Sequence, residues 1–412
     1  MQIRYLTIGV LLGTLPWSAY ATTLEEAMNI AEKSHPELSM SILDNKAAQA
    51  QLTSQSAYNY NPELSLEYQD RKDNAGVHGT DYYIGLSQGI EIAGKQGYRE
   101  QAAQAGLQLS ENYTESLRQQ LSIGAARAFV QLFLAKQALK VRMQQGKSLK
   151  VLSLAVKRQM DVGDANVLDA NLAQSAYTTA LSAVIEAKQN YALAQAQYNA
   201  AVGSVGHFET EVVLPRLKVD WRVPNNLLDI AINHRPEIAI LSAKQRQSNA
   251  QAELADAERY SDPTISLMGG REAGEDLVKL GISFALPLSN NRKGAYQASL
   301  AQELRSEQAL DWFKRRLKFE VQAAAQNHAY AMLALKDAHD MKQSLSTKSS
   351  ESLAEAAFKA GEISLEDLVI HINQALEARL TTLNFIKQSW FARIRLAEVL
   401  GQPELIIQGI QK

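Results

Sequence analysis

Histidine and cysteine are the residues that would most readily bind a metal or move a proton. The chain has seven histidines and no cysteine. No two histidines stand four residues apart, as they do in zinc sites on helices, and no glycine-rich phosphate loop occurs. His339 is followed directly by Asp340, and on a helix this reads as a solvated pair. The residue types therefore predict no enzyme activity, no metal site, no cofactor and no disulfide.

Charged side chains instead recur at alternate positions in segments that read as β-strands. Glu63 and Glu67 share the polar side of one segment, Glu91 follows on the polar side of the next, and Lys279 lies on that of a later one. If such strands enclose a pore, these residues line its lumen, where carboxylates favour cations. The alternative is that these residues only make the interior polar and hydrated, without any preference for cations.

A second set of candidate residues surrounds two glycines that interrupt long helical segments. Gly163 suits the position after a helix C-terminus, and Asn166 suits the N-cap of the next helix. Asp169 then falls in the first turn, where a negative charge is favourable. These residues predict helix ends that form two equivalent tips: Val162, Gly163, Asp164 and Asp169 in the first, and Ala360, Gly361, Glu362 and Asp367 in the second.

The alternating segments predict two β-hairpins, at about 62–93 and 263–288. In the first, Glu63 to Gln69 and Tyr82 to Ile92 alternate between apolar and polar residues. In the second, Thr264 to Gly270 and Leu277 to Leu288 do the same. Each strand approaches the roughly ten residues that a tilted strand needs to cross a bilayer.

Each hairpin leads into a very long helical segment. No proline occurs between Pro62 and Pro215 or between Pro287 and Pro403. Apolar and small residues recur with a heptad-like spacing, as in coiled coils. Roughly 60 residues of helix would reach about 90 Å, far beyond an ordinary globular domain. The sequence predicts antiparallel helical hairpins at about 97–203 and 291–401.

These elements occur twice, with an offset of about 200 residues. Pro36 corresponds to Pro236, Gly163 to Gly361 and Gly203 to Gly401. The chain therefore divides into a first repeat at 22–203, a linker at 204–226, a second repeat at 227–401 and a C-terminal tail at 402–412.

Residues 1–21 have the pattern of a cleavable signal peptide. Arg4 supplies the positive end, Leu6 to Leu15 the apolar run, and Ala19 to Ala21 the cleavage pattern. No later stretch has the length and apolarity of a transmembrane helix. The formal net charge of -2 gives no nucleic-acid footprint. An exported protein is expected, in which any membrane is crossed by strands.

Four strands are too few to close a membrane barrel, and an open sheet edge in lipid is costly. Two chains would supply eight strands, and three would supply twelve with a wide lumen. The inference is a duct that the helices extend. The alternative from another class is a periplasmic coiled-coil scaffold with a soluble sheet. The regular apolar side of the strands favours the duct.

The whole expected mature chain resembles the TolC-type outer-membrane efflux factors. The signal peptide, the tandem repeat, the two β-hairpins and the two tipped helical hairpins carry this resemblance. The segment from Gly89 to Gln96 is most similar to the CzcC-like branch, which serves heavy-metal export. The resemblance implies an α+β membrane protein: a TolC-like homotrimer with four transmembrane β-strands per chain in a shared 12-stranded barrel, and long antiparallel α-helices in a periplasmic helical barrel.

The same resemblance implies a location and partners. The protein would lie in the outer membrane of a Gram-negative bacterium, in contact with outer-membrane lipid, and reach into the periplasm. It would meet a periplasmic adaptor (membrane fusion protein) at the tips and pass on cargo from an RND-type inner-membrane pump. Heavy-metal cations are the expected cargo, with drugs as the alternative. Without cysteine, the chain lacks the family's N-terminal lipid anchor. Ile363 stands where some members place a gating arginine.

Overall fold

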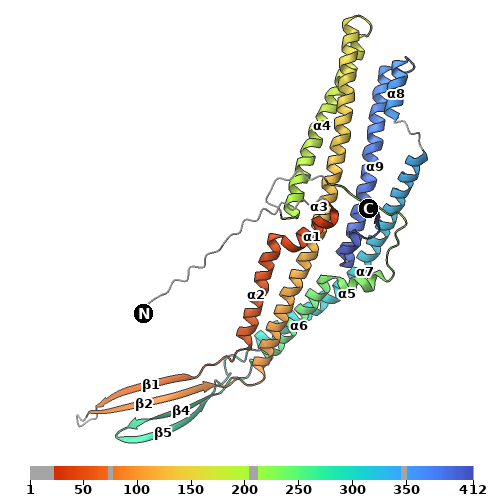
Figure 1. Cartoon of the computed structure of the whole chain (residues 1–412). Coiled ribbons are helices and arrows are strands. Elements are labelled where there is room, and N and C mark those ends of the chain that lie inside the picture. Colours follow the sequence, from red (N-terminus) through yellow and green to blue (C-terminus); the bar gives the residue numbers. More distant parts are fainter. Residues whose placement is uncertain (1–22, 73–77, 204–211, 345–349, 412) are drawn as a thin grey trace.

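The computed structural model describes residues 23–72, 78–203, 212–344 and 350–411. The expected signal peptide and the start of the expected linker lie outside these residues. Figure 1 shows an elongated molecule with the strands at one end and two helical tips at the other. Among the described residues, no helix is both long and apolar enough to cross a membrane.

The same order of elements occurs twice along the chain. The first half contains α1 (Leu24–Ser34), α2 (Pro36–Ser56), β1 (Glu63–Lys72), β2 (His78–Gly89), α3 (Lys95–Asp161) and α4 (Val167–Ala201). The second contains α5 (Leu227–His234), α6 (Pro236–Ala257), β4 (Thr264–Glu272), β5 (Glu275–Ser283), α7 (Lys293–Ser344), α8 (Ser350–Lys359) and α9 (Leu365–Leu400). Short segments add β3 (Arg216–Leu217), the 3₁₀ helix η1 (Pro403–Ile406) and β6 (Ile410–Gln411).

Local sequence signals set many of the helix ends. Thr23 and Glu26 form a capping box at the start of α1. Pro36 and Pro236 occupy the first positions of α2 and α6, where a missing N–H costs nothing. Strand ends differ from the expectation: β2 stops at Gly89 rather than Ile92, and β5 stops at Ser283 rather than Leu288. By contrast, β1 and β4 run on to Lys72 and Glu272, and β2 and β5 already begin at His78 and Glu275.

The four long strands form one antiparallel sheet in the order β1-β2-β4-β5. Strands β2 and β4 join the two halves of the chain, with Leu86 opposite Leu267. Leu64 lies opposite Leu86, and Leu267 opposite Leu280. The pairing therefore keeps most apolar side chains of the four strands on the same side of the sheet, with Met268 and Leu277 on the other side.

The main hydrophobic core lies midway along the molecule, away from both the sheet and the tips. It combines residues of α1, α3, α7, α9 and the C-terminal segment, including Phe129, Leu317 and Ile394. Much smaller clusters hold the helices near the tips, around Leu149 and Leu368 in one and Val156 in another.

Arg393 joins several segments inside the main core. Its side chain is fully buried, and its guanidinium lies 3.6 Å from the centre of the Trp221 ring. It donates hydrogen bonds to His328 Nε2 (3.1 Å) and to the carbonyl oxygens of Leu405 (3.3 Å) and Gln408 (2.8 Å). Burial lowers the pKa of Arg393 to about 10. Through these contacts, Arg393 of α9 holds together α7, the 212–226 segment and the C-terminal segment (402–411).

His328 makes the stability of this core dependent on pH. Burial, followed by the charge of Arg393, lowers the pKa of His328 from 6.5 to about 4. The unfolded chain therefore gains a proton at a higher pH than the folded chain does. The contribution of neutral His328 to the free energy of unfolding is fully present above about pH 6.5. It should fall by roughly 3 kcal/mol as the pH drops to about 4.

Unfolding by urea at a series of pH values checks this expectation. His328→Gln keeps an acceptor for Arg393 but cannot titrate, so it should flatten the pH dependence over this range. An equally steep loss of stability in His328→Gln and in the unchanged protein would assign the pH dependence to other groups.

Candidate functional site

One face of the sheet is apolar and uncovered. Leu280 is 78% exposed, Val278 77% and Leu66 73%. The register places Leu66 opposite Ile84 and continues this band across all four strands. An exposed apolar patch of this extent marks an interaction surface rather than a soluble edge. This face is suited to lipid.

The opposite face is polar and carries three of the predicted lumen residues, Glu63, Glu67 and Lys279. Lys279 Nζ lies 3.2 Å from Glu272 Oε2 and 5.1 Å from the centre of the Tyr83 ring. Glu63 and Glu67 are exposed on the edge strand β1. Carboxylates outnumber cations on this face, which bears Glu63, Glu67, Asp81, Glu272 and Glu275 against Arg71 and Lys279.

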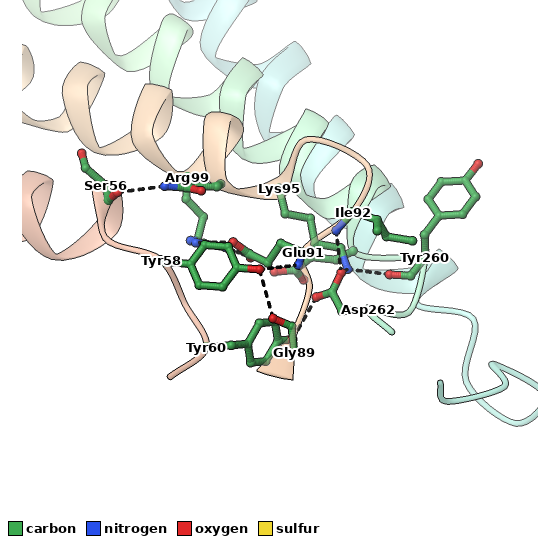
Figure 2. A network of polar contacts seen from close by, with 12 residues as sticks. Ser56, Tyr58, Tyr60, Gly89, Glu91, Ile92, Lys95, Arg99, Tyr260 and Asp262 are labelled. Carbon is green, nitrogen blue, oxygen red and sulfur yellow. Dashed lines mark hydrogen bonds and ion pairs between the residues drawn. The ribbon is translucent and has the colours of Figure 1, made fainter. Parts of the chain in front are cut away.

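Glu91, the fourth predicted lumen residue, lies elsewhere. Because β2 ends at Gly89, Glu91 stands in the connection to α3, where its side chain is buried and forms a two-pronged ion pair with Arg99. The expectation that Glu91 continues the polar side of a strand is therefore wrong. Figure 2 shows this pair beside Tyr58, whose hydroxyl donates to the Gly89 carbonyl (3.0 Å).

Asp262 organises the junction between the sheet and the helices. Its carboxylate accepts hydrogen bonds from Lys95 Nζ (2.7 Å), the Ile92 N–H (3.0 Å) and the Tyr60 hydroxyl (2.8 Å) (Figure 2). Lys95 also donates to the Tyr260 carbonyl (2.6 Å). Burial alone would raise the pKa of Asp262, but these hydrogen bonds outweigh it and hold the pKa below its usual value. The network ties the first repeat to the second.

Both tips have the same backbone geometry. Gly163 and Gly361 have φ of +86° and +76°, which favour glycine. The N–H of Asp164 donates to the Gln159 carbonyl (2.8 Å), and that of Glu362 to the Ala357 carbonyl (2.9 Å). Such bonds close the last turn of a helix. The glycines thus lie at the turns, with Val162, Ala360 and the two acidic residues beside them.

The next helices begin with side-chain caps. Asn166 Oδ1 accepts from the Asp169 N–H (2.7 Å), so Asp169 lies in the first turn of α4. Ser364 and Asp367 form a capping box at α9, and these hydrogen bonds lower the pKa of Asp367. The first tip also exposes Val167 (65%) and Leu168 (76%), which were not predicted. Their apolar side chains directly after the cap were the available signal.

The two groups of predicted residues lie at opposite ends of the molecule (Figure 1). The structure does not bring them together into a catalytic constellation. Within the described ranges, no group of three or more histidine, aspartate or glutamate side chains could hold a metal ion. What the arrangement offers is a two-faced sheet continued by long helices.

Comparison with known proteins gives no family model that matches and no curated relative. Solved structures do match. The CmeC outer membrane channel of Campylobacter jejuni has a TM-score of 0.76 at 16% identity, over 92% of this chain and 85% of that one. CusC, described in terms of transmembrane channel formation, has a TM-score of 0.74 at 18% identity, over 95% and 96%. The fold is that of the TolC-type channels.

The MtrE outer membrane channel of Neisseria gonorrhoeae, solved in its open state, agrees, with a TM-score of 0.70 at 16% identity over 92% of this chain and 89% of that one. The fold class expected from the sequence is thereby confirmed. In the single chain, β1 and β5 form the two edges of the sheet, so each has one side without a paired strand among the described residues.

Proposed function

We propose that this protein is the outer-membrane exit duct of a tripartite efflux system. It conducts cargo passively from an RND-type inner-membrane pump and a periplasmic adaptor to the exterior. The supporting observation is the four-stranded sheet, apolar on one face and polar on the other, which leads directly into helices as long as the 67 residues of α3. At 1.5 Å per residue, such a helix spans about 100 Å.

The outer membrane of a Gram-negative bacterium is the setting that suits this geometry. The signal peptide expected at 1–21 would direct the chain to export. The apolar sheet face then contacts lipid, and three chains close the barrel. The scaffold alternative would leave this apolar face in water, which a soluble protein rarely tolerates.

Heavy-metal cations are the proposed cargo, and drugs or other small molecules are the second candidate. The excess of carboxylates on the polar face supports cations. The CzcC-like segment from Gly89 to Gln96 supports them less, because its Glu91 and Lys95 have structural roles at the junction. A wide duct needs no metal ligands, since it does not hold what passes.

The tips are the proposed site of adaptor docking. Gly163 and Gly361 present bare backbone, with no atom within 4 Å of an added Cβ. Val162, Val167 and Leu168 offer apolar contacts beside the first tip, and Asp164, Asp169, Glu362 and Asp367 give both tips negative charge. With Ile363 in place of a gating arginine, closure of the aperture depends on other contacts.

A susceptibility panel on a deletion strain tests this function. Loss of the gene should sensitise cells to at least one metal salt or drug, and a plasmid copy should restore resistance. Sensitivity to metals alone supports the proposed cargo, and sensitivity to drugs alone supports the second candidate. Unchanged susceptibility to both classes would contradict the duct.

The face assignment makes a prediction for neighbouring residues of β5. Leu280→Arg should cost roughly 2–4 kcal/mol, because it places a charge in lipid near the middle of the bilayer. Lys279→Gln, on the polar face, should be tolerated. An outer-membrane insertion assay compares the two variants, and equal insertion of both would mean that the faces are assigned wrongly.

A further inference from the structure

The helices between the sheet and the main core lie side by side in the order α2-α3-α6-α7. The outer two, α2 and α7, each have one side that no other described helix covers. On α2 this side exposes Met40 (58%) and Leu43 (61%), and on α7 it exposes Leu304 (50%) and Trp312 (62%). Both helices therefore present unpartnered apolar sides at the two flanks of one chain.

The internal duplication supplies a template for covering them. Inside one chain, α3 of the first repeat packs against α6 of the second. By position in the repeat, α7 corresponds to α3 and α2 corresponds to α6. In a ring of identical chains, α7 of one chain would meet α2 of the next as α3 meets α6 within a chain.

A close contact in the template identifies the residues that would meet. A Cβ built on Gly106 of α3 would lie 3.0 Å from Gln247 Nε2 of α6. Both are the twelfth residue of their helix, and the twelfth residues of α7 and α2 are Leu304 and Ala47. The template sets a small residue on α3 against a large one on α6. In the counterpart pair, the large residue (Leu304) is on α7 and the small one (Ala47) is on α2. A small side chain therefore again faces a large one.

The surrounding residues follow the same antiparallel count. It sets Glu37, the second residue of α2, opposite Lys314 of α7, and it sets Met40 opposite Asp311, the residue before Trp312. Glu37 and Lys314 are exposed in the single chain. Opposite charges and two apolar side chains therefore meet along the same line.

We propose that α7 of one chain packs against α2 of the next, with Leu304 against Ala47 of the partner subunit and Lys314 against Glu37 of the partner subunit. This inference rests on the proposed trimeric duct and specifies the surface through which its helical part closes. The occupant of the free α7 side is thus a second copy of this chain.

Disulfide cross-linking tests the contact without background, because the chain has no cysteine. Ala47→Cys and Leu304→Cys are introduced together into the full-length protein, which is oxidised mildly in outer-membrane extracts and run on non-reducing gels. Within one chain these positions are separated by α3 and α6, so a disulfide must join two chains. Covalent dimers and trimers are expected, and reductant should remove them.

The control pair combines Ala47→Cys with Tyr330→Cys. Tyr330 is exposed on the same helix but about 39 Å further along, so it should not cross-link. No covalent dimer from the Ala47 and Leu304 pair in a sample that runs as a trimer on a native gel would overturn the proposal, as would a monomer on that gel. Cross-linking together with unchanged metal and drug susceptibility would support the contact and contradict the duct instead.

Discussion

Replacing Lys95 with methionine should lower the free energy of unfolding by about 3–5 kcal/mol per chain, because it leaves the buried Asp262 carboxylate without its cation. The side chains of Lys95 and Asp262 are only 8% and 11% exposed. The remaining hydrogen bonds from Tyr60 and the Ile92 N–H cannot neutralise the charge. The measurement is the urea midpoint of the detergent-extracted protein, with the heat stability of the trimer on gels beside it.

Two variants sharpen this test. Arg259→Met removes an ion pair with Asp256 in which both side chains are about 40% exposed, so it should change stability by less than about 1 kcal/mol. Adding Asp262→Asn to Lys95→Met removes the unpaired charge and should recover part of the loss. Equal effects of Lys95→Met and Arg259→Met would show that the junction is not a buried ion pair in the assembled protein.

This junction also marks where prediction from the sequence stops. Alternation along the strands and the caps at Asn166 and Ser364 are local signals, and the structure follows them. The strand ends were missed because the alternation continues through Ile92 while the backbone has already left the sheet. The Ile90 N–H donates to the Pro263 carbonyl (2.8 Å), and Asp262 accepts from Ile92.

Those partners lie about 170 residues away along the chain, so no local pattern reveals them. In the sequence, Asp262 is distinguished only by its place before Pro263, which directly precedes a predicted strand. Lys95 stood out only within a short motif. Their pairing follows from the duplicated fold, which brings the end of β2 beside the start of β4. The free sides of α2 and α7 were hidden for a similar reason, since only the arrangement of helices shows which side lacks a partner.

Replacing Gly163 or Gly361 with tryptophan should abolish export while leaving the trimer folded. At a positive φ, a side chain costs roughly 1–2 kcal/mol. The surroundings add nothing to this, because an added Cβ at either glycine meets no atom within 4 Å. Both tips lie far from the main core and the sheet (Figure 1). The indole would instead occupy the space that the adaptor must enter, so docking should fail.

Alanine at the same positions separates bulk from backbone strain. Gly163→Ala and Gly361→Ala carry the same positive-φ penalty but little volume, so they should keep most of the resistance. Trimer level in the outer membrane and resistance to the exported compound are measured together for all four variants. Normal resistance with either tryptophan would remove that tip from the mechanism. Loss of the trimer with alanine as well as tryptophan would mean that the glycines are needed for folding. Loss of resistance with tryptophan alone, in a protein that still forms trimers, would identify contact with the adaptor as the step that fails.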